Sequence, residues 1–288
     1  MKPFSLRRRF HRGIGIAGQL GRAGISETGA QVPRSPGFPD YNSGAPTEVE
    51  LPADVDPMSV AHIGAAFYNT FVLLAGSGVL CSGSNAAGQC GSAIATHAGL
   101  KPIPELDHER LKRVAGGYCH TMALTESGRL YTLGCGEDGQ RGDDRPLADE
   151  DEFPAATMNE VVLPSGQLVG AIAAGANHSL AISKDGRSLW GWGSNDIGQL
   201  GPSVEDNVST PVPISIDIDR PGDPVTNRIV SVTAGYAHSA VLTTSGRVFT
   251  FGRGENGQLG SKTAEDNPTP TEVAMSQGSP LPQCSVGR

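Results

Sequence analysis

Three histidines recur at the same place in a repeated pattern, and such a set could in principle bind a metal ion. They are His120, His178 and His238, spaced 58 and 60 residues apart. A zinc site needs ligands that converge within about 2 Å of one ion, whereas one histidine per repeat is spread along the chain. A neutral imidazole both donates and accepts hydrogen bonds. The pattern therefore favours a structural role, connecting one repeat to the next, and predicts no metal site.

Two glycine-rich segments have the spacing of a dinucleotide-binding loop. Gly134–Gly139 and Gly252–Gly257 both match G-x-G-x-x-G. That loop needs a strand before it and a helix after it, so that the phosphates meet the helix N-terminus. Here the segment recurs in each repeat and continues into Gly-Gln-x-Gly. We interpret these glycines as turn residues and expect no cofactor.

Catalytic groups and zinc-type cysteine pairs are missing from the sequence. There is no G-x-S-x-G segment and no recognisable set of nucleophile, base and oxyanion donors, so we do not expect an enzyme. The five cysteines form no C-x-x-C pair. An odd count without zinc spacing predicts reduced, mainly structural thiols, typical of a reducing compartment.

An acidic stretch lies between two of the repeats, where loops commonly carry binding residues. A solvated loop and a contact for a basic protein partner are the two interpretations, since charge runs are often simply solvated. The candidate partner-binding residues are Asp143, Asp144, Asp149, Glu150, Asp151 and Glu152.

The charge of the chain is divided unevenly. Residues 1–26 hold six basic and no acidic residues, while the other 16 basic and 30 acidic residues give residues 27–288 a net charge of −14. An acidic body disfavours binding to nucleic acid phosphates. No apolar run approaches the roughly 20 residues of a membrane-spanning helix, and no secretory core follows the basic start. We expect an intracellular protein without a membrane span.

Residues 1–12 form a separate basic leader or tail. The arginine-rich, acid-free composition with interspersed Phe4, Leu6 and Phe10 is similar to a mitochondrial presequence. A nuclear-localisation patch and a solvated tail, in a cytoplasmic or nuclear protein, are the alternatives. The repeats begin at Gly13, so this leader could be removed without cutting the predicted fold.

The elements that position these residues are short strands joined by glycine turns. Residues 172–201 contain two apolar runs around Asp185-Gly186, a pattern typical of a β-hairpin. Similar repeat cores lie near residues 59–91, 112–142, 170–201 and 229–260, and a glycine turn without its strands spans 13–21. In the first core, Asn69 or Thr70 replaces the histidine. We expect each blade to contain a linker strand, one histidine strand that includes Ala173-Ala-Gly-Ala-Asn-His178, and a hairpin partner.

A period of 50 to 60 residues with about four short strands indicates a β-propeller blade. The 39 glycines and 21 prolines agree with many tight turns. We therefore predict an all-β propeller as a single domain over residues 13–288. The residues predicted to connect its blades are His120, His178, His238, Gln89, Gln140, Gln199 and Gln258.

The segments Ala173–Ile182 and Trp192–Gly201, with their parallel copies, resemble the regulator of chromosome condensation repeat family. The resemblance covers roughly residues 13–275 and implies a propeller of seven blades. Only four hairpin copies and one leading turn can be counted here, so the ring is predicted to be incomplete or truncated. Four or five blades would expose a blade face at each end. A protein partner, a second copy or further sequence would then cover those ends.

The resemblance leaves three functions to weigh. The first is a non-catalytic scaffold that binds a protein partner through its loops or open edge. The second is guanine-nucleotide exchange on a small GTPase, the activity of the founding member, although no loop here matches the wedge that such activity needs. The third is ultraviolet-B sensing, which needs clustered tryptophans, whereas this chain has only Trp190 and Trp192. The scaffold is the main prediction and the exchange factor is the alternative.

Overall fold

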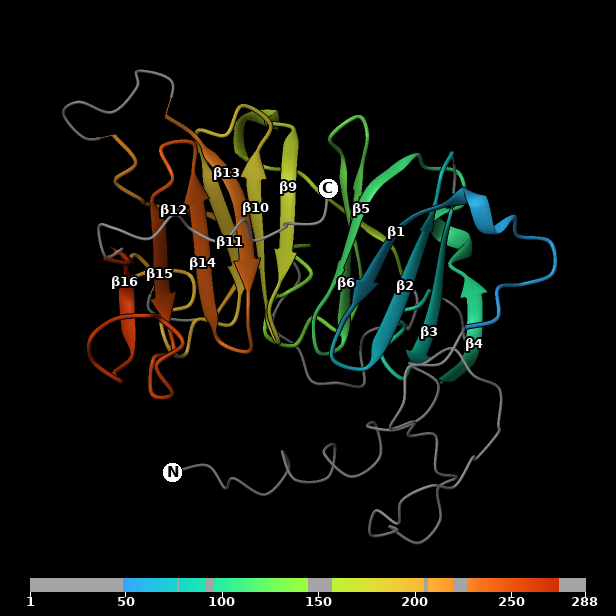
Figure 1. Cartoon of the computed structure of the whole chain (residues 1–288), viewed down its shortest axis with the longest axis horizontal. Coiled ribbons are helices and arrows are strands. Elements are labelled where there is room, and N and C mark those ends of the chain that lie inside the picture. The colour runs from blue at the N-terminus through green and yellow to red at the C-terminus, as the bar shows by residue number, and fades with distance from the viewer. Residues whose placement is uncertain are drawn as a thin grey trace, which may run out of the picture.

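The computed structural model is built almost entirely of antiparallel β-sheet (Figure 1). It describes residues 49–76, 78–91, 96–144, 157–204, 207–219 and 227–274. Within these ranges, three short 3-10 helices lie between the strands: η1 (Pro57–Ser59), η2 (Pro104–Leu106) and η3 (Pro164–Gly166). Among the described residues, no helix is long and apolar enough to cross a membrane.

In the described part of the chain, the strands form four sheets of four, which we call blades 1 to 4. Blade 1 contains β1 (Val60–Ala65), β2 (Asn69–Leu74), β3 (Val79–Ser84) and β4 (Thr96–Pro102). Blade 2 contains β5 (Leu111–Gly116), β6 (His120–Thr125), β7 (Leu130–Gly134) and β8 (Asn159–Val161). Blade 3 contains β9 (Val169–Ala174), β10 (His178–Ser183), β11 (Leu189–Gly193) and β12 (Val208–Ile214). Blade 4 contains β13 (Ile229–Ala234), β14 (His238–Thr243), β15 (Val248–Gly252) and β16 (Asn267–Glu272).

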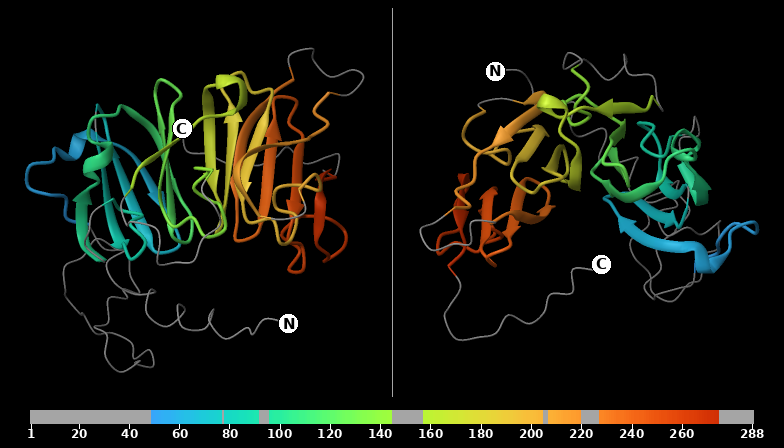
Figure 2. Two further views of the ribbon diagram at one scale, coloured as in Figure 1. Left: turned by 180° about the vertical axis from the view of Figure 1, so that it is seen from behind. Right: turned by 90° about the horizontal axis from the view of Figure 1, so that it is seen from above.

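The blades lie side by side in an arc that does not close into a ring. The view down the arc in Figure 2 (right) shows the opening between blade 1 and blade 4. The first strands β1, β5, β9 and β13 contact one another in sequence order and face the axis. An open β-propeller is therefore present, in agreement with the predicted fold class.

The apolar core lies between blades as much as within them. One cluster joins Met122 and Leu124 of blade 2 to Ile172 and Trp192 of blade 3. A second joins blade 3 to blade 4, and a third joins blade 1 to blade 2. We call the side of a blade that meets the next blade in sequence its trailing face, and the opposite side its leading face.

The prediction of one histidine strand in each blade is wrong, because the structure has two strands there. In blade 3, β9 ends at Ala174, the chain reverses through residues 175–177, and β10 begins at His178. The reversal adds the fourth strand, next to the axis. By contrast, the hairpin around Asp185-Gly186 is present as β10 and β11, with His178 opposite Gly193.

The prediction of reduced thiols is also wrong for four of the five cysteines. Cys81 is bonded to Cys90, and Cys119 is bonded to Cys135. The hairpin of β6 and β7 pairs His120 with Gly134, which brings the residues just outside that pair together. Cys284 lies outside the described residues.

Candidate protein-binding surfaces and the contacts between blades

Each histidine ring lies against the glycine three residues before it. The pairs are Gly117 with His120, Gly175 with His178 and Gly235 with His238, and a Cβ atom at any of these glycines would collide with the ring. Glycine is therefore required where the chain turns from the first strand of a blade to the second. The imidazoles of His120 and His178 lie at the trailing faces of their blades, where they meet serines of the next blade.

The histidine of blade 2 reaches into blade 3. His120 Nε2 lies 3.0 Å from Ser179 Oγ, and the Ser179 hydroxyl donates a 2.8 Å hydrogen bond to the Gln140 carbonyl. Trp192 Nε1 donates to the same carbonyl at 3.0 Å. His120, Ser179, Gln140 and Trp192 are all buried. One hydroxyl of blade 3 thus binds two groups of blade 2.

The next interface repeats this arrangement with different partners. His178 Nε2 lies 3.1 Å from Ser239 Oγ, whose hydroxyl donates to the Gln199 carbonyl at 2.7 Å. Between blades 1 and 2, the Thr121 hydroxyl donates to the Gln89 carbonyl at 2.8 Å.

Asn69 is the residue that replaces histidine in blade 1, because it pairs with Gly83 as His120 pairs with Gly134. Its side-chain amide donates within its own blade, to the Ser84 carbonyl at 2.6 Å.

The hydrogen-bond network determines the protonation of the two buried histidines. Each serine hydroxyl has one hydrogen, which it donates to a glutamine carbonyl, so the imidazole Nε2–H must donate to the serine oxygen. Burial lowers the pKa of His120 to about 4 and that of His178 to about 3. Both rings are therefore neutral at pH 7, and their Nδ1 atoms have no hydrogen-bond partner among the described residues. This chemistry suits a structural contact.

The four glutamines hold their own turns with their side chains. Each side-chain oxygen accepts a hydrogen bond from the backbone N–H two residues earlier, at 2.9 to 3.0 Å. These residues are Gln89, Gln140, Gln199 and Gln258. The backbone carbonyls of Gln89, Gln140 and Gln199, rather than their side chains, make the contacts with the next blade described above.

Aromatic residues that the sequence analysis did not single out gather at one mouth of the axis. Ring centroids lie 5.8 Å apart for Phe67 and Tyr118, 5.9 Å for Phe67 and Tyr236, and 5.0 Å for Tyr68 and Tyr118. These four residues, which we call the axial patch, come from the first turns of blades 1, 2 and 4. Phe67 is 41% exposed and Tyr236 is 56% exposed. Partial burial and the Tyr68 hydroxyl raise the pKa of Tyr118.

A groove of about 640 Å³ runs along the axis. Its walls are mainly β1, β5, β9 and β13, and they carry small apolar side chains together with His62, Arg113 and Thr233. Ile63 lines it and is highly exposed. Among the described residues, no three histidines, cysteines or carboxylates lie close enough to hold a metal ion.

The acidic candidate residues are only partly described. The side chain of Asp143 is almost fully buried, and its carboxylate lies 3.0 Å from Arg141 Nε. Asp144 is exposed, in the left-handed backbone region at a φ of 55°. Asp149, Glu150, Asp151 and Glu152 lie outside the described residues. Binding of a basic partner by this stretch therefore stays a prediction. The Asp143 side chain would not contribute to that binding while it pairs with Arg141.

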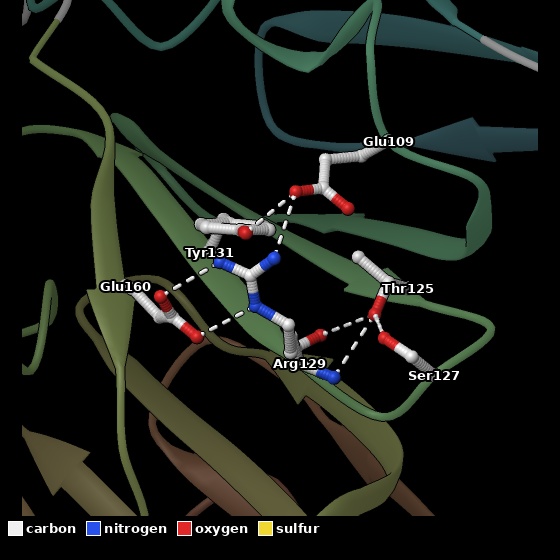
Figure 3. Close-up of polar contacts among 6 residues, drawn as sticks. All are labelled: Glu109, Thr125, Ser127, Arg129, Tyr131 and Glu160. Carbon is white, nitrogen blue, oxygen red and sulfur yellow. Dashed lines mark hydrogen bonds and ion pairs between the residues drawn. The ribbon is translucent and has the colours of Figure 1, made fainter.

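A polar cluster on blade 2 has the residue types of a catalytic site but the contacts of a structural one. Figure 3 shows that Arg129 donates to both carboxylate oxygens of Glu160, at 2.8 and 2.9 Å, and to Glu109 at 3.2 Å. Arg129 lowers the pKa of Glu160. The Tyr131 hydroxyl donates to Glu109 at 2.7 Å. The arginine is 46% exposed, so these ion pairs contribute little stability.

The comparisons with known proteins agree with this architecture. The model of the RCC1-like domain family matches residues 9–288. The chain is 35% identical over 187 residues to the human probable E3 ubiquitin-protein ligase HERC3, covering 65% of this chain and 16% of the ligase. It is 31% identical over 184 residues to the mouse regulator of chromosome condensation, covering 63% of this chain and 40% of that protein.

Among solved structures, yeast RCC1 (Prp20), crystallised with Kap60, superimposes with a TM-score of 0.63. The sequence identity is 23%, and the match covers 75% of this chain and 49% of that one. The chain thus spans about half or less of these relatives. The comparisons give no support to a mitochondrial location. The repeated blades, their connecting histidines and the match over residues 9–288 place this chain in the RCC1-like domain family.

Proposed function

We propose that this chain is a non-catalytic β-propeller scaffold that binds a protein partner at the axial patch. The exposed rings of Phe67 and Tyr236 carry the proposal, because blades at opposite ends of the arc bring them together. Large aromatic side chains contribute much of the affinity at the centres of protein interfaces. The acidic stretch that begins at Asp143 would add electrostatic attraction for a basic partner.

The names of related proteins support a protein partner. One yeast structure is of RCC1 bound to Kap60, and another is described with its binding properties to Gsp1p and histones. Kap60, Gsp1p and histones are named as partners of those yeast proteins, and they are not assigned to this chain. For this chain, family membership supports the class of function, an interaction module, while the identity of the partner is open to experiment.

Removal of the exposed rings tests the proposal. The double variant Phe67→Ser, Tyr236→Ser should lose proteins that the wild-type chain retains from a lysate of its source cells, measured by quantitative mass spectrometry. Val162→Ser is the matched control, since Val162 is 67% exposed and is not one of the axial patch residues. Equal retention by all three proteins would refute the assignment of the patch.

The alternative function is nucleotide exchange on a small GTPase, which family membership supports. A release assay with a fluorescent guanine nucleotide, run over a panel of small GTPases, separates the two proposals. Faster release from any one GTPase would favour exchange over a purely scaffolding role. Unchanged rates across the panel, together with specific capture of a partner, are the result expected for the scaffold.

A further inference from the structure

The two disulfide bonds differ in how far solvent can reach them. Cys81 and Cys90 are both 0% exposed. Cys119, in the turn between β5 and β6, is partly exposed, whereas its partner Cys135 is 4% exposed. Exchange with an external thiol begins when a thiolate bonds to one sulfur of the disulfide, so access to that sulfur limits the reaction. Of these four cysteines, Cys119 is the accessible one.

The buried sulfur of this pair has a hydrogen-bond donor beside it. Gln140 Nε2 lies 3.1 Å from Cys135 Sγ and 4.0 Å from Cys119 Sγ. The same contact in blade 3 joins Gln199 Nε2 to Ser194 Oγ at 3.0 Å. A donor to sulfur favours the thiolate over the thiol, and the sulfur that forms the more stable thiolate is the better leaving group. Gln140 therefore favours Cys135 as the leaving sulfur when Cys119 is attacked.

Blade 2 does not need this disulfide in order to keep its turn. The Cys135 N–H donates to the Cys119 carbonyl at 2.9 Å. Blade 3 has the same hydrogen bond without cysteines, from the Ser194 N–H to the Asn177 carbonyl at 2.7 Å. Together with the ladder between β6 and β7, this hydrogen bond should hold the turn after the disulfide opens. The bond can therefore be opened in a folded chain.

We infer that Cys119 is a thiol-exchange site, which forms a mixed disulfide with a small thiol of the glutathione class while the Cys81–Cys90 bond stays closed. The thiolate of the small molecule bonds to Cys119 Sγ as the bond to Cys135 breaks. The electron pair of that bond leaves on Cys135 Sγ, which takes up a proton from water. A second small thiol then releases Cys119 as a thiol and departs as the small-molecule disulfide.

The exchange site lies beside the axial patch, because Cys119 follows Tyr118 in the same turn. The centroid of the Tyr118 ring is 5.0 Å from that of Tyr68. A mixed disulfide at Cys119 would therefore place a polar, charged group next to these rings. The reaction itself requires no protein partner, so the inference goes beyond the proposed function.

Timed exchange with reduced glutathione tests this order of reaction. The full chain, purified under oxidising conditions, is incubated with reduced glutathione at neutral pH without denaturant. Excess N-ethylmaleimide stops the reaction, and peptide mass spectrometry locates both groups. Glutathione should appear on Cys119 and N-ethylmaleimide on Cys135. The Cys81–Cys90 bond should open at least about tenfold more slowly, because a thiol reaches it only when blade 1 unfolds.

Substitution of Gln140 tests the part played by the leaving sulfur. Gln140→Glu keeps the side-chain oxygen that accepts from the Asp138 N–H but loses the amide that donates to sulfur. It should slow the appearance of glutathione on Cys119 at least about threefold. Gln199→Glu is the matched control, because it makes the same change in blade 3 and should leave that rate unchanged. Equal rates in the wild-type chain and both variants would refute the role assigned to Gln140.

Three results in the wild-type chain would overturn the inference. One is opening of both disulfides at the same rate, because exchange would then depend on unfolding of the whole chain. The second is glutathione on Cys135 in place of Cys119, or on neither. The third is a chain in which Cys119 and Cys135 stay unlinked under oxidising conditions. None of these measurements uses a captured partner, so failure here is distinguishable from failure of the axial-patch proposal.

Discussion

The two serines between blades provide a matched pair of substitutions with different predicted costs. Ser239→Ala removes the hydroxyl donor to the Gln199 carbonyl and the acceptor for His178 Nε2–H. Ser179→Ala removes the corresponding contacts with Gln140 and His120. The difference is Trp192, whose indole N–H still donates to the Gln140 carbonyl after the substitution. Among the described residues, no second donor reaches the Gln199 carbonyl.

The expected costs follow from the number of buried groups left without a partner. Each such group costs about 1 to 3 kcal/mol. Ser239→Ala leaves two and should lower the free energy of unfolding by about 2 to 6 kcal/mol. Ser179→Ala leaves only the His120 N–H and should cost about 1 to 3 kcal/mol. Ser239→Ala is therefore predicted to be the more damaging change, although both serines are fully buried.

Urea unfolding followed by circular dichroism measures the free energy of unfolding of both variants. The two values can be compared if the m values are unchanged. Ser203→Ala is the control, since Ser203 is exposed, and it should change the free energy of unfolding by less than about 0.5 kcal/mol. Equal costs for the two buried serines, or a cost near zero for Ser239→Ala, would refute the connection that we assign to these hydroxyls.

Three further predictions follow from the same contacts. Stability should depend on pH, because the unfolded chain takes up protons at histidines that stay neutral in the folded chain. The free energy of unfolding should have its full value above about pH 6.5 and fall by about 1.4 kcal/mol per pH unit for each of His120 and His178 toward pH 4. His178→Gln should reduce this slope in urea titrations, and an unchanged slope would contradict the assignment. Gly198→Ala should lower the free energy of unfolding by at least about 1 kcal/mol more than Gly257→Ala does. Both glycines have a φ near 75°, but only Gly198 faces Pro268. Equal midpoints of unfolding for the two variants would count against that contact. Alkylation of the denatured chain, followed by mass spectrometry, should label four more cysteines after reduction than before it, whereas equal labelling would restore the prediction of free thiols.

Sequence periodicity predicted the strands, the hairpins and the repeat because each depends on local pattern. The turn before His178 was missed because apolar alternation runs through Gly175 without a break. The signal was the glycine itself, whose missing Cβ leaves room for the histidine ring. The Cys119–Cys135 bond could have been inferred from the hairpin register, since both residues adjoin the His120–Gly134 pair.

The axial patch could not be predicted in this way. Phe67, Tyr118 and Tyr236 lie about 50 to 170 residues apart in the sequence, and no local pattern marks them as neighbours. They meet because successive blades turn about one axis, so their proximity depends on the number of blades and the curvature of the arc. The fold class followed from local periodicity, while this candidate surface needed the tertiary structure.

Hydrogen exchange of the chain with and without its captured partner tests the central claim most directly. We predict that the partner slows amide exchange in the turns that carry the axial patch, at residues 66–68, 117–119 and 235–237. Protection confined to the hairpin turns at residues 126–129 and 184–187, away from the axial patch, would contradict the proposal that this protein binds its partner at the axis.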